Sequence, residues 1–187
     1  MTATLPMYPF PEWRGATETL WAAVRRHVPD LPLLAAWDAE VDVHALWRSP
    51  SMAVSQTCGW PLVTGLTGLV RVVGTFRYRT RRWSGDRYRS VIVARRDADA
   101  PCSGTAAVNG RDSLSGWVSL VAFLSREPDD VLVTGSHLAS LAAVVDGTAS
   151  FASVDAVTFA YAELHRPDLV AGLTVVSEGP CVPCLPL

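Results

Sequence analysis

Hydrophobic and polar positions alternate along the chain in short blocks, and these blocks predict strands and helices in turn. Apolar residues at Ala16, Leu20, Ala23 and Val24 have the spacing of one face of an amphipathic helix. Short, uniformly apolar runs are typical of strands buried on both faces. We predict strands at 5–8, 33–37, 52–54, 105–108, 130–133, 150–154 and 173–176, and helices at 13–27, 42–47, 117–124, 138–145 and 156–165. This alternation predicts an α/β fold with mostly parallel pairing.

One region departs from the alternation of strands and helices. We predict that residues 70–80 and 87–95 are extended segments that pair with each other around a turn at 83–86. Nine of the sixteen arginines lie between Arg71 and Arg96. Arginines that alternate with aromatic residues are typical of a strand with one solvent-exposed face, and they are also typical of proteins that bind single-stranded nucleic acid. The net charge of −2 and the lack of RNA-binding signatures argue against a nucleic-acid partner.

Composition narrows the class of protein further. The chain has 187 residues, of which 49% are apolar, so one large domain or two small lobes can bury a core. Cys181 and Cys184 have the spacing of half a zinc site, but no second pair accompanies them, and we expect neither a metal nor a cofactor. The first residues lack the features of a signal peptide, and no apolar run is long enough to insert into a membrane.

The stretch from Gly104 to Trp117 carries the strongest candidate chemistry. Asn109 ends a predicted buried strand, and a helix follows that Asp112 or Ser113 can cap. The first N–H groups of a helix lack internal partners and carry partial positive charge, so they favour an anion. The hydroxyl of Ser115 adds a further donor, and Gly116 permits a close approach to the backbone. The stretch predicts an anion site, and the alternative is a capped helix without a ligand.

Other polar residues also follow predicted strands. In parallel sheets, ligands bind at the carboxyl ends of the strands. Tyr8, Gln56, Thr57, Ser136, His137 and Asp155 lie at such positions, as do Asn109, Ser113 and Ser115. Structural roles remain open for several of them: His137 and Asp155 can cap the helices that follow, and Tyr8 can pack in the core.

An ordered series of motifs resembles the phosphate/phosphite/phosphonate substrate-binding proteins of ABC transporters. The motifs are Ser-Gln-Thr-Cys-Gly (55–59), Tyr-Arg-Ser-Val-Ile-Val (88–93), Ala-Val-Asn to Ser-Leu-Ser-Gly (107–116), Thr-Gly-Ser-His-Leu-Ala-Ser-Leu (134–141) and Ala-Ser-Val-Asp-Ala-Val (152–157). The resemblance implies a two-lobed type II periplasmic-binding-protein fold with a two-strand hinge. Lobe one spans residues 1–92, lobe two residues 93–173, and residues 174–187 return to lobe one.

The resemblance also implies roles for single residues. Ser113 and Ser115, with the backbone of Gly116, would cradle phosphoryl oxygens, and His137 would donate to the same group. Asp155 would face a protonated oxygen or an amine of the ligand. Tyr8 and Thr57 would close from lobe one, and Gln56, Asn109 and Ser136 complete the expected ligand-binding set. The implied function is binding of a small oxyanion, phosphonate- or phosphate-like, without chemistry, for an ABC permease.

Two features depart from the family. A transport receptor needs export to the periplasm, whereas the visible N-terminus predicts a cytoplasmic protein. Family members also continue beyond the position of Leu187, so a shortened lobe one would expose an apolar face and favour a homodimer. The alternative function is a small enzyme, similar to thiamine-precursor synthases, in which Cys58 is the nucleophile and His137 the base.

Overall fold

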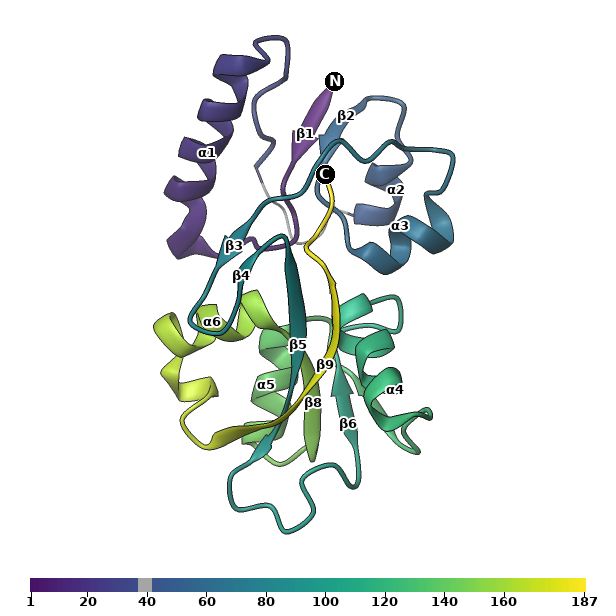
Figure 1. Ribbon diagram of the computed structural model, residues 1–187, viewed down its shortest axis with the longest axis vertical. Helices are drawn as coiled ribbons and strands as arrows, with labels where there is room; N and C mark the ends of the chain where they lie inside the picture. Colours follow the sequence, from purple (N-terminus) through teal and green to yellow (C-terminus); the bar gives the residue numbers. More distant parts are fainter. Residues whose placement is uncertain (37–41) are drawn as a thin grey trace. The chain divides into compact units, whose positions relative to one another are not determined.

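Two units make up the computed structural model, which describes residues 1–36 and 42–187 (Figure 1). Unit 1 comprises residues 1–75 and 185–187, and unit 2 comprises residues 76–184. The predicted lobe boundaries, after residues 92 and 173, fall inside β5 (Arg87–Arg95) and at the start of β9 (Leu173–Pro183). These boundaries need correction because β5 and β9 pair with each other from end to end, which keeps both whole strands in unit 2.

A five-stranded sheet in the order β7-β6-β8-β5-β9 forms the centre of unit 2. The strands β6 (Ala106–Val108), β7 (Val131–Val133) and β8 (Phe151–Asp155) are parallel, and β5 runs antiparallel to both β8 and β9. The sheet is therefore mixed, and its consecutive parallel strands are connected through helices. This is the α/β class that the sequence predicts.

Helices cover both faces of this sheet (Figure 1). The helices α5 (His137–Val145) and α6 (Ala156–His165) share one core cluster with Val91 and Val93 of β5. On the other face, Leu120 of α4 (Ser119–Leu124) packs with Ile92 of β5. Successive residues of β5 thus enter opposite cores, which explains why this segment is an uninterrupted apolar run.

Unit 1 is built around two parallel strands, β1 (Thr2–Thr4) and β2 (Met52–Ser55). Around them lie η1 (Pro11–Trp13), α1 (Arg14–His27), α2 (Val43–Trp47) and α3 (Gly59–Gly65). The predicted helix at 13–27 is confirmed, and the predicted strand at 5–8 lies earlier, at β1. Of the predicted strand at 33–37, Leu34 forms a single bridge to Ala3, and residue 37 lies outside the described residues.

The predicted pairing of residues 70–80 with 87–95 is wrong. A short hairpin forms instead between β3 (Tyr78–Arg79) and β4 (Ser84–Gly85), and β5 pairs with β8 and β9. The buried partners of β5 come from distant parts of the chain, and they offer more apolar contact than the arginine-rich segment beside it. Helix α3 was not predicted from the sequence, because its glycines and proline are poor helix formers.

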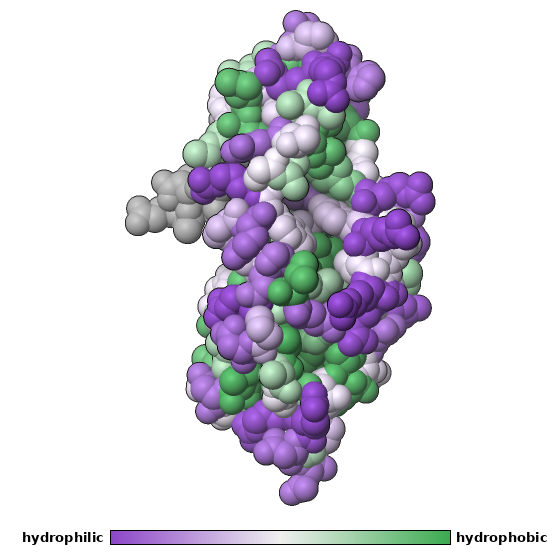
Figure 2. Space-filling view, turned by 90° about the vertical axis from the view of Figure 1, so that its left-hand side faces the viewer, coloured by the Kyte–Doolittle hydropathy of each residue, from purple (hydrophilic) through white to green (hydrophobic). Residues whose placement is uncertain are grey.

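Unit 1 exposes several large apolar side chains. Leu69 and Val73 are 66% and 69% exposed. An apolar pocket of about 430 Å³ lies beside them, with Trp47, Met52 and Leu66 among its lining residues. Elsewhere the surface is mixed: hydrophobic and hydrophilic residues are interspersed on the face that Figure 2 shows. The homodimer remains a prediction.

Gly179 of β9 allows close packing between this strand and α4. A Cβ added at Gly179 would overlap the Ser119 hydroxyl and lie 3.3 Å from Ser119 Cβ. We expect Gly179→Ala to lower the free energy of unfolding by about 1–3 kcal/mol through overpacking. Urea unfolding measures this loss, and Ser119→Ala in the same chain should restore part of it.

Gly172 provides the matched control, because a Cβ there would meet nothing within 4 Å. Gly172→Ala should leave the stability nearly unchanged. Equal unfolding midpoints for the two alanine variants would show that the contact between Gly179 and Ser119 does not limit packing.

Candidate functional site

Three helical segments begin at one edge of the unit 2 sheet. The π-helical turn η2 (Leu114–Val118) follows β6, α5 follows β7, and α6 follows β8. Because β6, β7 and β8 are parallel, their carboxyl ends share this edge. The N-termini of the three segments therefore gather where ligands bind in sheets of this kind.

Two serines and a histidine form a hydrogen-bonded row at this edge. Ser113 caps η2, and its Oγ accepts from the Gly116 N–H at 2.9 Å. Ser115 Oγ lies 2.9 Å from His137 Nε2 and 3.4 Å from Ser113 Oγ. The two serines are 6% and 4% exposed, so their hydroxyls are nearly removed from water. The structure thus brings together three residues that the sequence analysis selected.

Ser153 of β8 attaches this row to the sheet. Its Oγ donates to the backbone carbonyl of Ser115 at 2.6 Å, and the bond is buried. The backbone carbonyl of Ser113 accepts from the N–H groups of both Trp117 and Val118. These bonds fix the first turn of η2, which continues directly into α4. Ser115 therefore sits on a rigid element, as a precise site requires.

Asp155 lies at the end of β8 and is 3% exposed. Its Oδ1 accepts from the N–H groups of Val157 and Thr158 at 2.8 and 2.9 Å. The structural role that the sequence left open, the cap of α6, is therefore the observed one. Contact between Asp155 and a ligand remains a prediction.

His137 occupies the first turn of α5, which Ser136 caps through a bond to the Ala139 N–H. Burial lowers the pKa of His137, and the opposing attraction of the Asp155 carboxylate is smaller. The backbone carbonyl of Ser153 also favours the charged ring, although the buried Nδ1 forms no hydrogen bond of good geometry with a described residue. With its pKa below the usual range, the ring is predominantly neutral at pH 7.

Gly116 has a packing role at this edge, and contact of its backbone with a ligand remains a prediction. Its N–H is committed to Ser113, and a Cβ at this position would overlap Asn109 Oδ1. The small residue thus admits the side chain of Asn109. The Oδ1 atom of Asn109 is buried without a hydrogen-bond partner among the described residues.

Two further serines belong to this edge, and the sequence analysis missed them. Ser90 and Ser119 are 1% and 3% exposed, and neither hydroxyl has a hydrogen-bond partner among the described residues. Ser90 pairs with Asp155 on the neighbouring strand, and both serines lie beside Gly179. Ser90 could have been noticed in the sequence, because it is a polar residue next to the apolar run of β5. Ser119 could not, because a serine in a helix is common.

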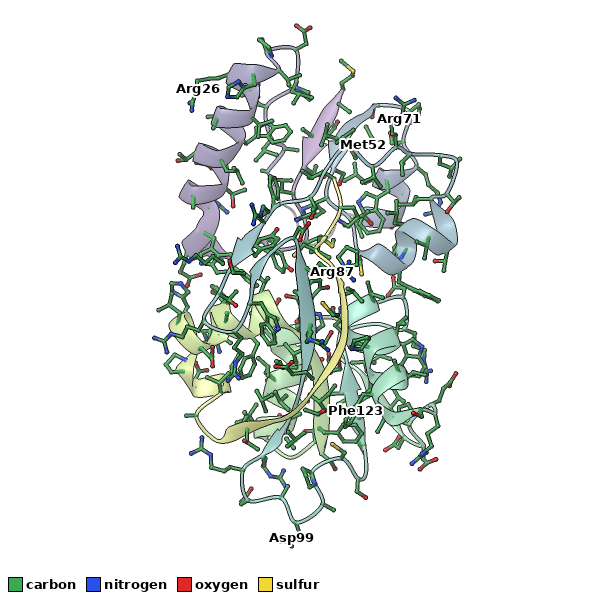
Figure 3. The ribbon with its side chains drawn as sticks, viewed as in Figure 1. Arg26, Met52, Arg71, Arg87, Asp99 and Phe123 are labelled. Atoms are coloured by element: carbon green, nitrogen blue, oxygen red, sulfur yellow. The ribbon has the colours of Figure 1, made fainter. Side chains whose placement is uncertain are left out.

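Charge is distributed unevenly along unit 2. Because β5 is antiparallel to β8, the start of β5 lies beside the carboxyl end of β8. Five exposed arginines lie at or just before the start of β5: Arg77, Arg79, Arg81, Arg82 and Arg87. Acidic residues gather beyond the other end of the strand, where β6 and β7 begin: Asp97, Asp99, Glu127, Asp129 and Asp130. Figure 3 shows Arg87 and Asp99 at these opposite ends. Ion pairs partly neutralise both ends: Arg82 pairs with Glu163 at the first, and Arg95 with Asp97 and Arg126 with Asp129 at the second. The other arginines before β5 add positive potential near the carboxyl edge.

The predicted residues of unit 1 also lie at a carboxyl edge, that of β1 and β2. Gln56 and Thr57 directly follow β2 and are 2% and 6% exposed. The Thr57 N–H donates to the backbone carbonyl of Pro186 at 3.0 Å. Tyr8 follows β1 and stacks on Phe10 with ring centroids 6.1 Å apart, so it has the packing role that the sequence left open.

All four cysteines are free thiols. Cys58 precedes α3 in unit 1, and the Nε2 atom of His137 in unit 2 pairs with Ser115. Cys184 is buried, which raises the pKa of its thiol to about 11, whereas Cys181 is exposed. No group of three metal-ligating side chains is found in residues 1–36 and 42–187. Nor does any helix of these segments have the length and apolar character of a membrane span.

The lowered pKa of His137 predicts how stability depends on pH. Between the folded and the unfolded pKa the unfolded chain binds more protons, so stability falls as the pH falls from about 6.5. We expect His137→Gln to lose less stability than the wild type between pH 7.5 and 5.5 in urea unfolding. His165→Gln, in the same unit, is the control and should follow the wild type. Parallel curves for wild type and His137→Gln would contradict the prediction.

Comparisons with known proteins place this geometry in context. No protein-family model and no curated protein sequence matches the chain. Its structure is similar to a binding protein component of an ABC phosphonate transporter from Pseudomonas aeruginosa, with a TM-score of 0.67 and 14% identity over 99% of this chain and 67% of that one. It is also similar to PhnD1 from Prochlorococcus marinus in complex with methylphosphonate, with a TM-score of 0.71 and 11% identity over 99% of this chain and 74% of that one.

A third similar structure is XAC2383 from Xanthomonas citri bound to ATP, with a TM-score of 0.64 and 16% identity over 100% of this chain and 74% of that one. Two of the three are named as phosphonate-binding or transporter proteins, and none of the three is named as an enzyme. At these identities the likeness concerns the fold. The chain has the type II periplasmic-binding-protein fold found in substrate-binding proteins of ABC phosphonate transporters.

Proposed function

We propose that this protein binds a small tetrahedral oxyanion, of the phosphonate or phosphate class, without transforming it. The observation that carries the proposal is the buried row of Ser113, Ser115 and His137 at the start of the η2–α4 helical run. Hydroxyl and imidazole groups at a helix N-terminus stabilise an anion through hydrogen bonds and the helix dipole, and no lysine is needed.

Other buried polar atoms at this edge of the sheet support the proposal. The Ser90 and Ser119 hydroxyls lie at the same edge of the sheet, and both are buried without a hydrogen-bond partner among the described residues. A buried polar group without a partner costs free energy, and a ligand that accepts several hydrogen bonds would remove that cost. A tetrahedral oxyanion offers several acceptor oxygens in a small volume.

The similar structures support the ligand class and a transport role. PhnD1 is described in complex with methylphosphonate, and the Pseudomonas protein as a component of a phosphonate transporter. An ABC permease is therefore the proposed partner.

A thermal-shift screen tests the ligand class. Methylphosphonate, phosphate, phosphite, sulfate and methanesulfonate are compared at equal concentration, because a ligand that binds only the folded state raises the melting temperature. We expect a rise for at least one phosphorus oxyanion that exceeds the rise for methanesulfonate. A cooperative melting transition that none of the anions shifts would contradict the proposed function.

Substitution of Ser115 tests the place of binding. We expect Ser115→Ala to weaken the anion selected by the screen by about 1.5–3 kcal/mol, the usual loss of a hydrogen bond to a charged group, which is roughly 10- to 150-fold in Kd. Isothermal titration calorimetry measures the change. Ser150→Ala, directly before β8 and at the end of the strand away from the carboxyl edge, is the control and should bind as the wild type does. Equal affinity of the two variants would remove Ser115 from the site.

A further inference from the structure

The hydrogen atoms available to the serine row are limited, and they can be counted. Each hydroxyl has one hydrogen to donate and can accept in return. Ser113 Oγ already accepts from the Gly116 N–H, and Ser115 Oγ lies between Ser113 Oγ and His137 Nε2. The Ser115 hydroxyl can therefore donate to His137, to Ser113 or to a ligand, but only to one of them. The protonation state of His137 determines which of these acceptors it bonds.

The neutral ring takes this hydrogen. Because Nε2 faces Ser115, Nδ1 is the other ring nitrogen, and it is buried. The Ser153 backbone favours the protonated ring, although it forms no hydrogen bond of good geometry with Nδ1, and a backbone carbonyl can only accept. We infer that the neutral ring carries its hydrogen on Nδ1, so Nε2 accepts from the Ser115 hydroxyl. Ser115 Oγ can then only accept a hydrogen bond from a ligand, and an anionic oxygen without a hydrogen cannot donate one.

Protonation of the ring reverses this bond. The charged ring has hydrogen on both nitrogens, so Nε2 donates to Ser115 Oγ and the hydroxyl hydrogen of Ser115 becomes available to a ligand. The charged group that acts on the ring from the neighbouring elements is Asp155, at the junction of β8 and α6, and its attraction favours the protonated state. A bound anion would favour that state further.

We propose that His137 and Ser115 form a proton-coupled switch that sets the ionisation state of the anion bound at this site. An oxyanion that keeps one acidic hydrogen donates it to Ser115 Oγ while His137 is neutral. An oxyanion without an acidic hydrogen binds together with one proton from solution, which is taken up by His137. This inference rests on the proposed function, and it names the property of the ligand that the site recognises.

Sulfate is the probe that isolates the switch, because it carries no acidic hydrogen near neutral pH and does not titrate there. Above the pKa of His137, the affinity of the wild type for sulfate should fall about tenfold for each unit of pH, as linkage to one proton requires. Calorimetry at pH 6.0–8.5, in buffers of different ionisation enthalpy, measures both the affinity and the protons taken up. The wild type should take up about one proton per sulfate at the upper end of this range.

His137→Gln is the decisive variant, since its amide can donate to Ser115 Oγ at every pH. We expect its sulfate affinity to be independent of pH and its proton uptake to be absent. His165→Gln should retain the slope of the wild type. A sulfate affinity of the wild type that does not change with pH would overturn the switch, as would the same dependence on pH in His137→Gln and the wild type.

A measurement without ligand keeps the inference separate from the proposed function. Nitrogen-15 NMR of the imidazole rings should find the neutral His137 ring with its hydrogen on Nδ1, and a neutral ring with hydrogen on Nε2 would overturn the switch. If NMR finds the Nδ1 form and no tetrahedral anion binds, the proposed function fails while the hydrogen-bond arrangement of the row stands.

Discussion

The candidate site depends on one buried bond, from Ser153 Oγ to the backbone carbonyl of Ser115. The bond joins the central strand β8 to the first turn of η2, and it lies out of water, where a lost partner is costly. Through this bond the position of Ser115 is set by the sheet. The distance from Ser115 Oγ to His137 Nε2 therefore depends on how β7 and β8 pair with β6.

Two glycines make this arrangement possible, and neither works through an unusual backbone conformation. Gly116 leaves space for the side chain of Asn109, and Gly179 lets β9 approach Ser119 of α4. In both places the approaching atom is polar and buried. Because these glycines have no side chain, the polar atoms of Asn109 and Ser119 can lie close to the carboxyl edge. The two glycines therefore contribute both to packing and to the arrangement of polar groups at the candidate site.

Burial governs the electrostatics of the row. The pKa of His137 is lowered because the ring is removed from water, while Asp155 is close enough to moderate that effect. The neutral ring and the two hydroxyls allow hydrogen atoms to be redistributed inside the row without a fixed charge there. The arginines near the start of β5 supply positive potential from the surface instead.

The sequence by itself determined the α/β class, the helices after β6, β7 and β8, and most of the polar residues at their N-termini. It could do so because apolar periodicity and capping residues act over a few positions along the chain. The caps at Ser113, Ser136 and Asp155 illustrate this. Only the tertiary structure decided that β5 pairs with β8 and β9, that Ser90 and Ser119 join the edge, and that Gly116 faces Asn109. Except for Gly116 and Asn109, these are contacts between residues far apart in the sequence. All of them depend on which buried surfaces fit together, which no local pattern encodes.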